Sequence, residues 1–332
     1  MGSENVQVSF FQHIKALLPP HLSLVDEIAE LLHISNDSAY RRIRGEKPMA
    51  FDELQNLCGH FKISLDQFFH LQSDSLVFTG RTAGQDTFDY EQYLQDVIRN
   101  LKLMNSFSSK ELYYLNKDIP IFHYFHYPEM AVFKSFFWMK TILHYPQYAS
   151  QSFRLDGSLN EKVLELGHQM LDAYHSLPSQ EIWNTESINS TIRQIEYYKN
   201  SGVFASRQDI IIIYDSLQKI IDHLECQAEA GYKFTAGSSI EKAGAPYKIY
   251  VNEFILGDNT ILAMLGDRRI TYVNHSVLNY LVTSDPGFCE YTYQHIRNII
   301  KRSTLISEVG EKERKRFFNI LREKVSARQH AL

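Results

Sequence analysis

The residues between Leu24 and Pro48 constrain the fold more than any other part of the chain, because they predict two short helices with a tight turn between them. The first helix is indicated by apolar residues at helical spacing, namely Leu24, Ile28, Leu31 and Leu32. Ser35 can cap the N-terminus of the second helix, and Asp37 lies in its first turn. Gly45 ends this helix, and Pro48 keeps it from resuming.

Three more helices are predicted around this pair. An earlier apolar stripe, stopped by Pro19 and Pro20, consists of Phe10, Ile14, Leu17 and Leu18. Asp52 opens a fourth helix, whose inward residues are Leu54, Leu57, Cys58 and Phe61. Ser64 caps a fifth helix, whose inward residues are Leu65, Phe68 and Phe69. Residues 1–70 are therefore predicted to form a compact all-α domain of five helices.

The third of these helices has two different faces. Ala39 and Ile43, four residues apart, make an inward apolar pair, whereas the first turns carry polar, cationic and aromatic side chains. Residues 22–69 resemble the helix-turn-helix of the Cro/phage-repressor (XRE) family. Ile28 to Ser35 match the second helix and the turn of that family, and Asn36 to Gly45 match its recognition helix. Phe51 to Phe69 match its two closing helices, and Ile63 to Phe68 match the sequence with which the family's domain typically ends.

The resemblance implies that this domain binds double-stranded DNA, with the start of the third helix in the major groove. The base-reading side chains would be Asn36, Asp37, Tyr40 and Arg41. Asn can pair with adenine and Arg with guanine, and Asp can accept a hydrogen bond from cytosine. Contacts to phosphate would come from Ser35, Ser38, Arg44 and Lys47. Two positions depart from the family: His33 stands at the turn position usually held by Gly, and Arg42 stands where a partly buried apolar residue is common.

The charge balance leaves a second interpretation open. Residues 1–70 hold six Lys and Arg against nine Asp and Glu, which is an acidic balance for a DNA-binding domain. Four of the six cations fall between Arg41 and Lys47, on the expected DNA face. The alternative to DNA binding is therefore a protein-interaction or signal-sensing module that uses the helix-turn-helix as a docking surface.

The rest of the chain is predicted to be larger and mostly helical. Residues 71–87 indicate a polar linker, and residues 88–230 an irregular α-helical region for dimerisation and for sensing a small-molecule or protein effector. Residues 231–332 indicate a small α+β region, separate or part of the same C-terminal domain. Its predicted three-stranded antiparallel meander comprises Tyr247 to Leu256, Thr260 to Leu265 and Arg269 to Asn274, followed by helices near 276–283, 289–303 and 311–327. The fold class is thus mostly α with a small C-terminal meander.

Three other stretches hint at sites. His123 and His126, with His144 further along, suggest a metal site or an effector pocket. The alternative is that these histidines are packed in the core or at an interface. The basic C-terminal run includes Lys301, Arg302 and residues 312–316, and it fits either DNA phosphates or an exposed helix face. Residues 247–274 could line a ligand pocket or form a dimer face.

Composition and motifs favour a regulator over an enzyme. The chain has a net charge of −5, so DNA binding must depend on a local patch rather than on bulk charge. Three scattered cysteines without ligand spacing fit a reduced, cytoplasmic setting, and no apolar run is long enough to span a membrane. No catalytic or cofactor-binding motif is present, so we expect no cofactor, no metal and no enzymatic activity. The sequence predicts a bacterial-type, homodimeric transcriptional regulator.

Overall fold

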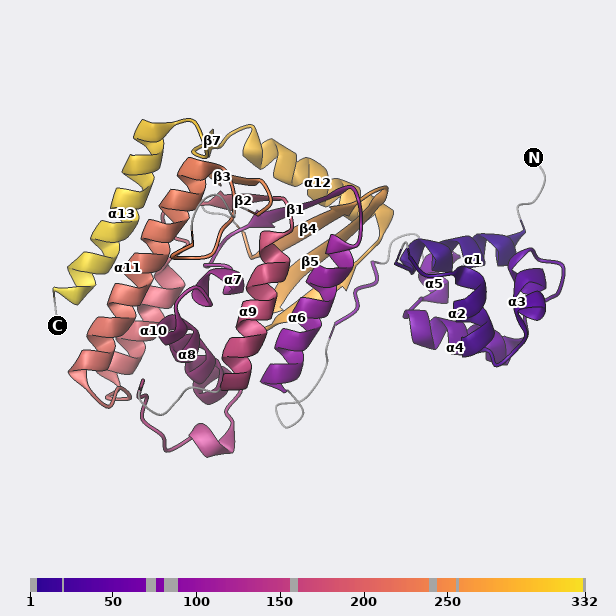
Figure 1. The fold of residues 1–332 in the computed structure, drawn as a ribbon, viewed down its shortest axis with the longest axis horizontal. Coiled ribbons are helices and arrows are strands. Elements are labelled where there is room, and N and C mark those ends of the chain that lie inside the picture. Colours follow the sequence, from indigo (N-terminus) through magenta and orange to yellow (C-terminus); the bar gives the residue numbers. More distant parts are fainter. Residues whose placement is uncertain are drawn as a thin grey trace. The chain divides into compact units, whose positions relative to one another are not determined.

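A computed structural model of the chain describes residues 5–19, 21–69, 76–80, 89–155, 161–238, 244–254 and 257–330. These residues form two compact units (Figure 1). The N-terminal unit comprises residues 1–79 together with 283–288, and the C-terminal unit comprises residues 80–282 together with 289–332. Of the predicted linker, residues 71–75 and 81–87 lie outside the described residues.

The N-terminal unit contains the five predicted helices. They are α1 (Val6–Leu17), α2 (Leu24–Leu31), α3 (Asn36–Ile43), α4 (Phe51–Phe61) and α5 (Leu65–Phe68). Their apolar stripes meet in one small core, whose buried members are Phe10, Phe11, Ile14, Ile28, Ala29, Ala39 and Leu57. The predicted cap at Ser35 also holds, because Ser35 Oγ accepts a hydrogen bond from the Ser38 N–H at 3.3 Å.

The C-terminal unit is built on a seven-stranded mixed sheet with the order β6-β5-β4-β1-β2-β3-β7. Its strands are β1 (Lys110–Leu115), β2 (Ser179–Trp183), β3 (Tyr247–Val251), β4 (Thr260–Leu265), β5 (Arg268–Ser276), β6 (Asn279–Thr283) and β7 (Thr304–Leu305). β2 pairs in parallel with both β1 and β3, whereas the β1–β4, β4–β5 and β3–β7 pairs are antiparallel.

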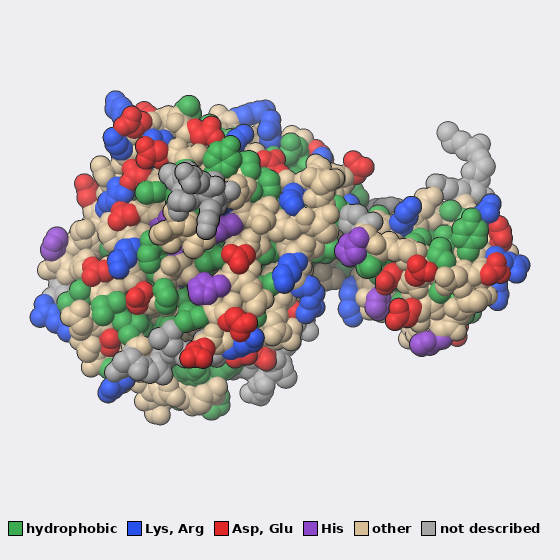
Figure 2. Space-filling view, viewed as in Figure 1, with side chains coloured by type: hydrophobic (Ala, Val, Ile, Leu, Met, Phe, Trp, Pro, Cys, Tyr) green, Lys and Arg blue, Asp and Glu red, His purple; other side chains and the backbone are tan. Residues whose placement is uncertain are grey.

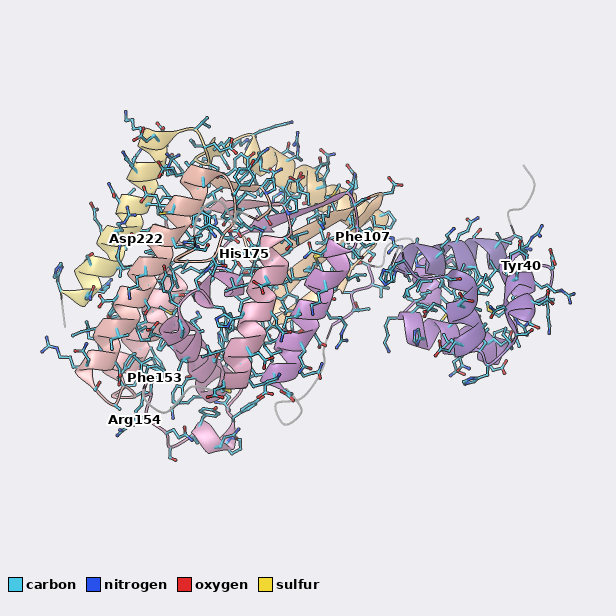
Figure 3. All side chains as sticks on the ribbon, viewed as in Figure 1. Tyr40, Phe107, Phe153, Arg154, His175 and Asp222 are labelled. Carbon is cyan, nitrogen blue, oxygen red and sulfur yellow. The ribbon has the colours of Figure 1, made fainter. Side chains whose placement is uncertain are left out.

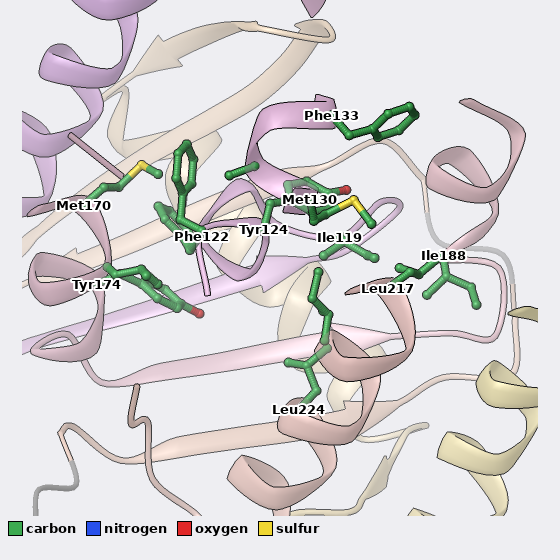
Figure 4. Packing of buried hydrophobic residues seen from close by; sticks show 14 of the residues in the cluster. Ile119, Phe122, Tyr124, Met130, Phe133, Met170, Tyr174, Ile188, Leu217 and Leu224 are labelled. Carbon is green, nitrogen blue, oxygen red and sulfur yellow. The ribbon is translucent and has the colours of Figure 1, made fainter. Parts of the chain in front are cut away.

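Helices cover both faces of this sheet. They are α6 (Tyr90–Asn105), α7 (Ile121–Tyr124), α8 (Pro128–Phe137), α9 (Glu161–His175), α10 (Asn189–Asn200), α11 (Arg207–Ala230), α12 (Pro286–Ile300) and α13 (Glu311–Gln329). A π-helical turn (Trp138–Ile142) and a 3-10 turn (Pro146–Tyr148) follow α8. The larger core lies between one face of the sheet and the helices other than α12, and Figure 4 shows Phe122, Tyr174 and Leu224 within it. On the other face, α12 packs through Cys289 and Ile296.

The predicted fold class was wrong for this unit. β1 and β2 lie within residues 88–230, which were predicted to be helical throughout, and residues 279–283 form a strand instead of a helix. The predicted meander was also wrong, because β1 and β2 separate β3 from β4 in the sheet. β2 is buried along its whole length, so its sequence has no alternation of apolar and polar residues to reveal a strand. Residues 88–230 and 231–332 both contribute strands to the one sheet.

Candidate nucleic-acid interface

The surface of α3 presents the side chains that were predicted to read bases. Ala39 is fully buried and Ile43 half-buried, and both belong to the small core. The exposed residues are Asn36, Asp37, Tyr40 and Arg41, and Figure 3 marks Tyr40 on this helix. The predicted phosphate contacts Ser35, Arg44 and Lys47 are exposed as well, and Ser38 is half-buried. The helix therefore offers a polar outer face on an apolar support.

The turn between α2 and α3 has the geometry that the family normally obtains from glycine. His33 adopts φ +53°, in the left-handed region. The Ile34 N–H donates to the Ala29 carbonyl at 3.0 Å, which satisfies an end of α2 and directs the chain into α3. The departure at His33 is thus accommodated with the same turn, although a side chain in this region costs about 1 kcal/mol.

The departure at Arg42 is explained by an ion pair between the buried Arg42 and the half-buried Glu53. Arg42 Nη2 and Nε donate to the two carboxylate oxygens of Glu53 on α4, at 2.6 and 2.9 Å. Arg42 Nη1 also donates to the Ser38 carbonyl at 3.2 Å. The hydrogen bond from Arg42 lowers the pKa of the Glu53 carboxyl. Because the guanidinium is paired at both ends, Arg42 can lie inside the unit and tie α3 to α4.

Gln7 of α1 holds the loop that follows α3. Its Nε2 donates to the carbonyls of Arg42 at 2.7 Å and Lys47 at 2.8 Å, and its Oε1 accepts from the Met49 N–H at 2.9 Å. The loop also depends on Gly45, which has φ +74° and approaches Asn5 so closely that a Cβ would lie 2.4 Å from its Nδ2. Sequence reasoning missed Gln7, because at least 35 residues separate it from its partners.

The cations of this face are engaged to different degrees. Arg44 Nε lies 3.3 Å from Glu46 Oε1, and its guanidinium lies over the Tyr40 ring, 5.5 Å from the ring centroid. Within the part of the chain that the structure describes, Arg41 and Lys47 form no ion pair. In Figure 2, cationic and acidic side chains lie beside one another at the end of the N-terminal unit where Figure 1 labels α3. The face is therefore mixed in charge, with two cations free to meet phosphates or bases.

The histidines that hinted at a metal lie inside the C-terminal unit. The His126 ring contacts the rings of His123, His175 and His223, with centroids 6.3, 5.3 and 4.4 Å away. His144 is exposed and takes no part in this cluster. Burial lowers the pKa of His175 to about 3 and that of His223 to about 4. Among the described residues, no group of three or more His, Cys, Asp or Glu side chains is arranged to hold a metal ion.

A buried carboxylate next to this cluster organises the core. Glu181 on β2 has no exposed surface, and its oxygens accept from Tyr247 Oη at 2.7 Å, Trp183 Nε1 at 2.7 Å, Asn116 Nδ2 at 3.0 Å and the Tyr174 hydroxyl. Burial alone would raise the pKa of Glu181, but His123 and the hydroxyls of Tyr174 and Tyr247 lower it to about 2. Tyr247 is thereby part of the core. These buried groups join α9, β2 and β3, which is a structural role.

Lys233 is a second buried charged residue in this region, next to Tyr174 and Ser179. Its Nζ donates to the carbonyls of Tyr174 at 3.0 Å and Leu177 at 2.6 Å, and to Ser179 Oγ at 2.5 Å. The ammonium therefore meets carbonyls at the C-terminal end of α9, where the helix dipole favours a cation. Burial lowers its pKa well below the ordinary value.

The basic C-terminal run is engaged in the fold only in part, because Lys301, Arg302, Lys312 and Arg316 are exposed. On α13, Arg314 is buried and donates to the Ile306 carbonyl at 3.0 Å, and Lys315 pairs with Glu311 at 2.5 Å. Further along, Arg322 pairs with Asp222 at 2.7 Å, and Lys324 pairs with Glu186 at 2.8 Å. The inner side of the helix carries Phe317, Phe318 and Leu321, all buried. α13 is therefore an amphipathic helix that packs through its inner side and carries cations on its outer side.

Comparison with known proteins adds no relative: no family model, curated protein or solved structure matches the chain. No helix of the described residues has both the length and the apolar character to cross a membrane.

Proposed function

We propose that this chain is a sequence-specific DNA-binding transcriptional regulator whose helix α3 reads the major groove. The observation that carries the proposal is the polar outer face of α3, where Asn36, Asp37, Tyr40 and Arg41 are exposed above the buried Ala39 and the Arg42–Glu53 pair. A short helix with base-pairing side chains in its first turns and a rigid support behind it is what major-groove recognition requires.

The positions of the side chains on and after α3 support assigning some of them to bases and others to phosphates. Arg41 follows Asp37 by four residues, so the two exposed side chains share a face of α3, and Arg41 is assigned to guanine. Arg44 and Lys47 lie at and beyond the C-terminal end of α3, and Gln7 holds the loop that carries Lys47. They are assigned to the phosphate backbone, together with Ser35 and Ser38.

The proposal includes a homodimer that acts in the cytoplasm. Two copies of α3 about 34 Å apart would meet half-sites one DNA turn apart. The C-terminal unit is assigned to dimerisation and to the sensing of an effector. Such an effector would control DNA binding only if it bound two arrangements of the dimer with different affinity.

The acidic balance of the N-terminal unit favours one alternative, a docking surface for another protein. The experiment that separates the two is selection from a randomised duplex library at near-physiological salt. The full chain is compared with an Asn36→Ala/Arg41→Ala double variant. The proposal expects enrichment of a roughly palindromic motif that the variant does not enrich. If neither protein enriches a motif, or both bind all duplexes equally, the docking alternative stands and the proposal fails.

A further inference from the structure

An acidic side chain of α2 contacts the first residue of α3. Asn36 Nδ2 donates to Asp26 Oδ1 at 2.9 Å, and both side chains are exposed. Asp26 lies in the first turn of α2, and Asn36 is the first residue of α3 after the Ser35 cap. The contact therefore joins the N-terminal ends of the two helices, at the edge that would face DNA.

An ionised carboxylate imposes one orientation on the amide that it meets. Asp26 can only accept hydrogen bonds, so the nitrogen of the Asn36 carboxamide must point toward it and the oxygen must point away. A carboxylate acceptor also makes a stronger hydrogen bond than a neutral one. The N-termini of α2 and α3 both favour a negative charge nearby, which stabilises the Asp26 carboxylate next to Asn36.

The amide keeps one complete recognition edge while it is held. When Asp26 accepts the Nδ2 hydrogen that points away from Oδ1, the second hydrogen of Asn36 Nδ2 lies on the same edge as Oδ1. That edge donates one hydrogen bond and accepts another. Adenine offers the complementary pair in the major groove, with N7 as acceptor and the N6 amino group as donor. Guanine offers two acceptors, so the Asn36 oxygen would face a second oxygen or nitrogen lone pair.

We propose that Asp26 is a specificity-determining positioning residue, which holds the Asn36 carboxamide in the orientation that pairs with adenine. The inference rests on the proposed function and extends it to the base read by one side chain. Asp26 does not contact the base. Its effect is to exclude the flipped amide, whose oxygen would meet the carboxylate.

The test measures base preference position by position. Variants of the selected motif, each with one base pair changed, compete for binding to the full-length protein. The wild type is expected to prefer adenine at one half-site position by about tenfold, and Asn36→Ala identifies that position by removing its preference. Asp26→Ala is expected to reduce the preference there to about threefold or less, with the other positions unchanged. Asp26→Asn is expected to fall between, because its amide can accept from or donate to Asn36.

Glu30→Ala is the matched control, because it removes another exposed carboxylate of α2 that the structure does not place on Asn36. Loss of any acidic charge here should raise the affinity for all duplexes, so Glu30→Ala should raise affinity and leave the adenine preference intact. If Asp26→Ala behaves like Glu30→Ala, the inference is wrong and the proposed function stands. If the wild type selects no motif, both are wrong. A change of preference at every position would also refute the inference, since it would indicate a displaced helix.

Discussion

The two units place their polar side chains in opposite ways. In the N-terminal unit, Asn36, Asp37 and Arg41 lie on the outer face of α3, and the Arg42–Glu53 ion pair only supports it. In the C-terminal unit, Glu181 and Lys233 have no exposed surface, and hydrogen bonds surround them. The contrast separates groups that are free to bind a partner from groups that hold strands and helices together. We expect substitutions to affect mainly binding in the first case and mainly stability in the second.

The largest effect is expected for Glu181→Ala. The substitution leaves the Tyr247 and Tyr174 hydroxyls and the Trp183 indole without their acceptor, so the free energy of unfolding should fall by about 4 kcal/mol or more. Urea unfolding followed by tryptophan fluorescence reports this unit specifically, because both tryptophans, Trp138 and Trp183, lie in it. Glu181→Gln keeps the side-chain volume and an acceptor oxygen, so its free energy of unfolding should fall by less than that of Glu181→Ala. Equal stability of wild type and Glu181→Ala would refute the structural role.

Arg42→Ala should have the next largest effect. It removes the buried partner of an ion pair and leaves the half-buried Glu53 without its guanidinium donor, and the expected cost is about 2 kcal/mol in the stability of the N-terminal unit. The loss should appear in far-ultraviolet circular dichroism and leave the tryptophan transition unchanged. The control Arg44→Ala breaks the exposed pair with Glu46 and should cost no more than about 0.5 kcal/mol. A similar effect of both substitutions would contradict the distinction between buried and exposed charges.

Acid should weaken the C-terminal unit through its buried histidines. The pKa of His223 is lowered to about 4 and that of His175 to about 3, so below the ordinary value of 6.5 the unfolded chain binds protons that the folded chain does not. The stability of the unit is therefore full above about pH 6.5 and is lost as the pH falls. The loss between pH 7 and pH 5 should be on the order of 2 kcal/mol for each of the two histidines, measured by urea unfolding. His223→Gln, whose amide can still donate to the Phe234 carbonyl, should reduce this dependence. An unchanged pH dependence in that variant would refute the assignment.

The smallest effect concerns the turn before α3. His33→Gly relieves a side chain at φ +53° and should stabilise the N-terminal unit by about 0.5 kcal/mol, after the entropy that glycine adds to the unfolded chain. Thermal unfolding by circular dichroism measures it. A lower midpoint would mean that the His33 side chain makes a favourable contact that outweighs the backbone cost.

The sequence was sufficient to predict the N-terminal unit because its signals are local. Ser35, Gly45 and the apolar spacing each act within one or two turns of helix. The sequence also indicated the outer face of α3, since Ala39 and Ile43 define the inner one. It could not indicate how Arg42 is accommodated or that Gln7 holds the loop, because both depend on partners brought close only by folding.

The C-terminal unit was predicted less well for the same physical reason. β2 carries Ser179, Gln180 and Glu181 in the middle of the sheet, and such polar residues do not resemble a central strand. They are tolerated there because partners from distant segments satisfy them, as Lys233 does for Ser179 and Tyr247 for Glu181. The parallel pairing of β2 with β3 likewise joins segments more than 60 residues apart, which no local pattern reports.

The most direct measurement of the central claim is the salt dependence of binding to a selected duplex and to a random duplex, for the wild type, Arg41→Ala and Arg44→Ala. If α3 reads bases, Arg41→Ala should lose about 1–3 kcal/mol on the selected duplex and little on the random one. Arg44→Ala should weaken both duplexes alike and reduce the salt slope by about one. Equal effects of the two substitutions on both duplexes, or no effect of either, would contradict the assignment of α3 to the major groove.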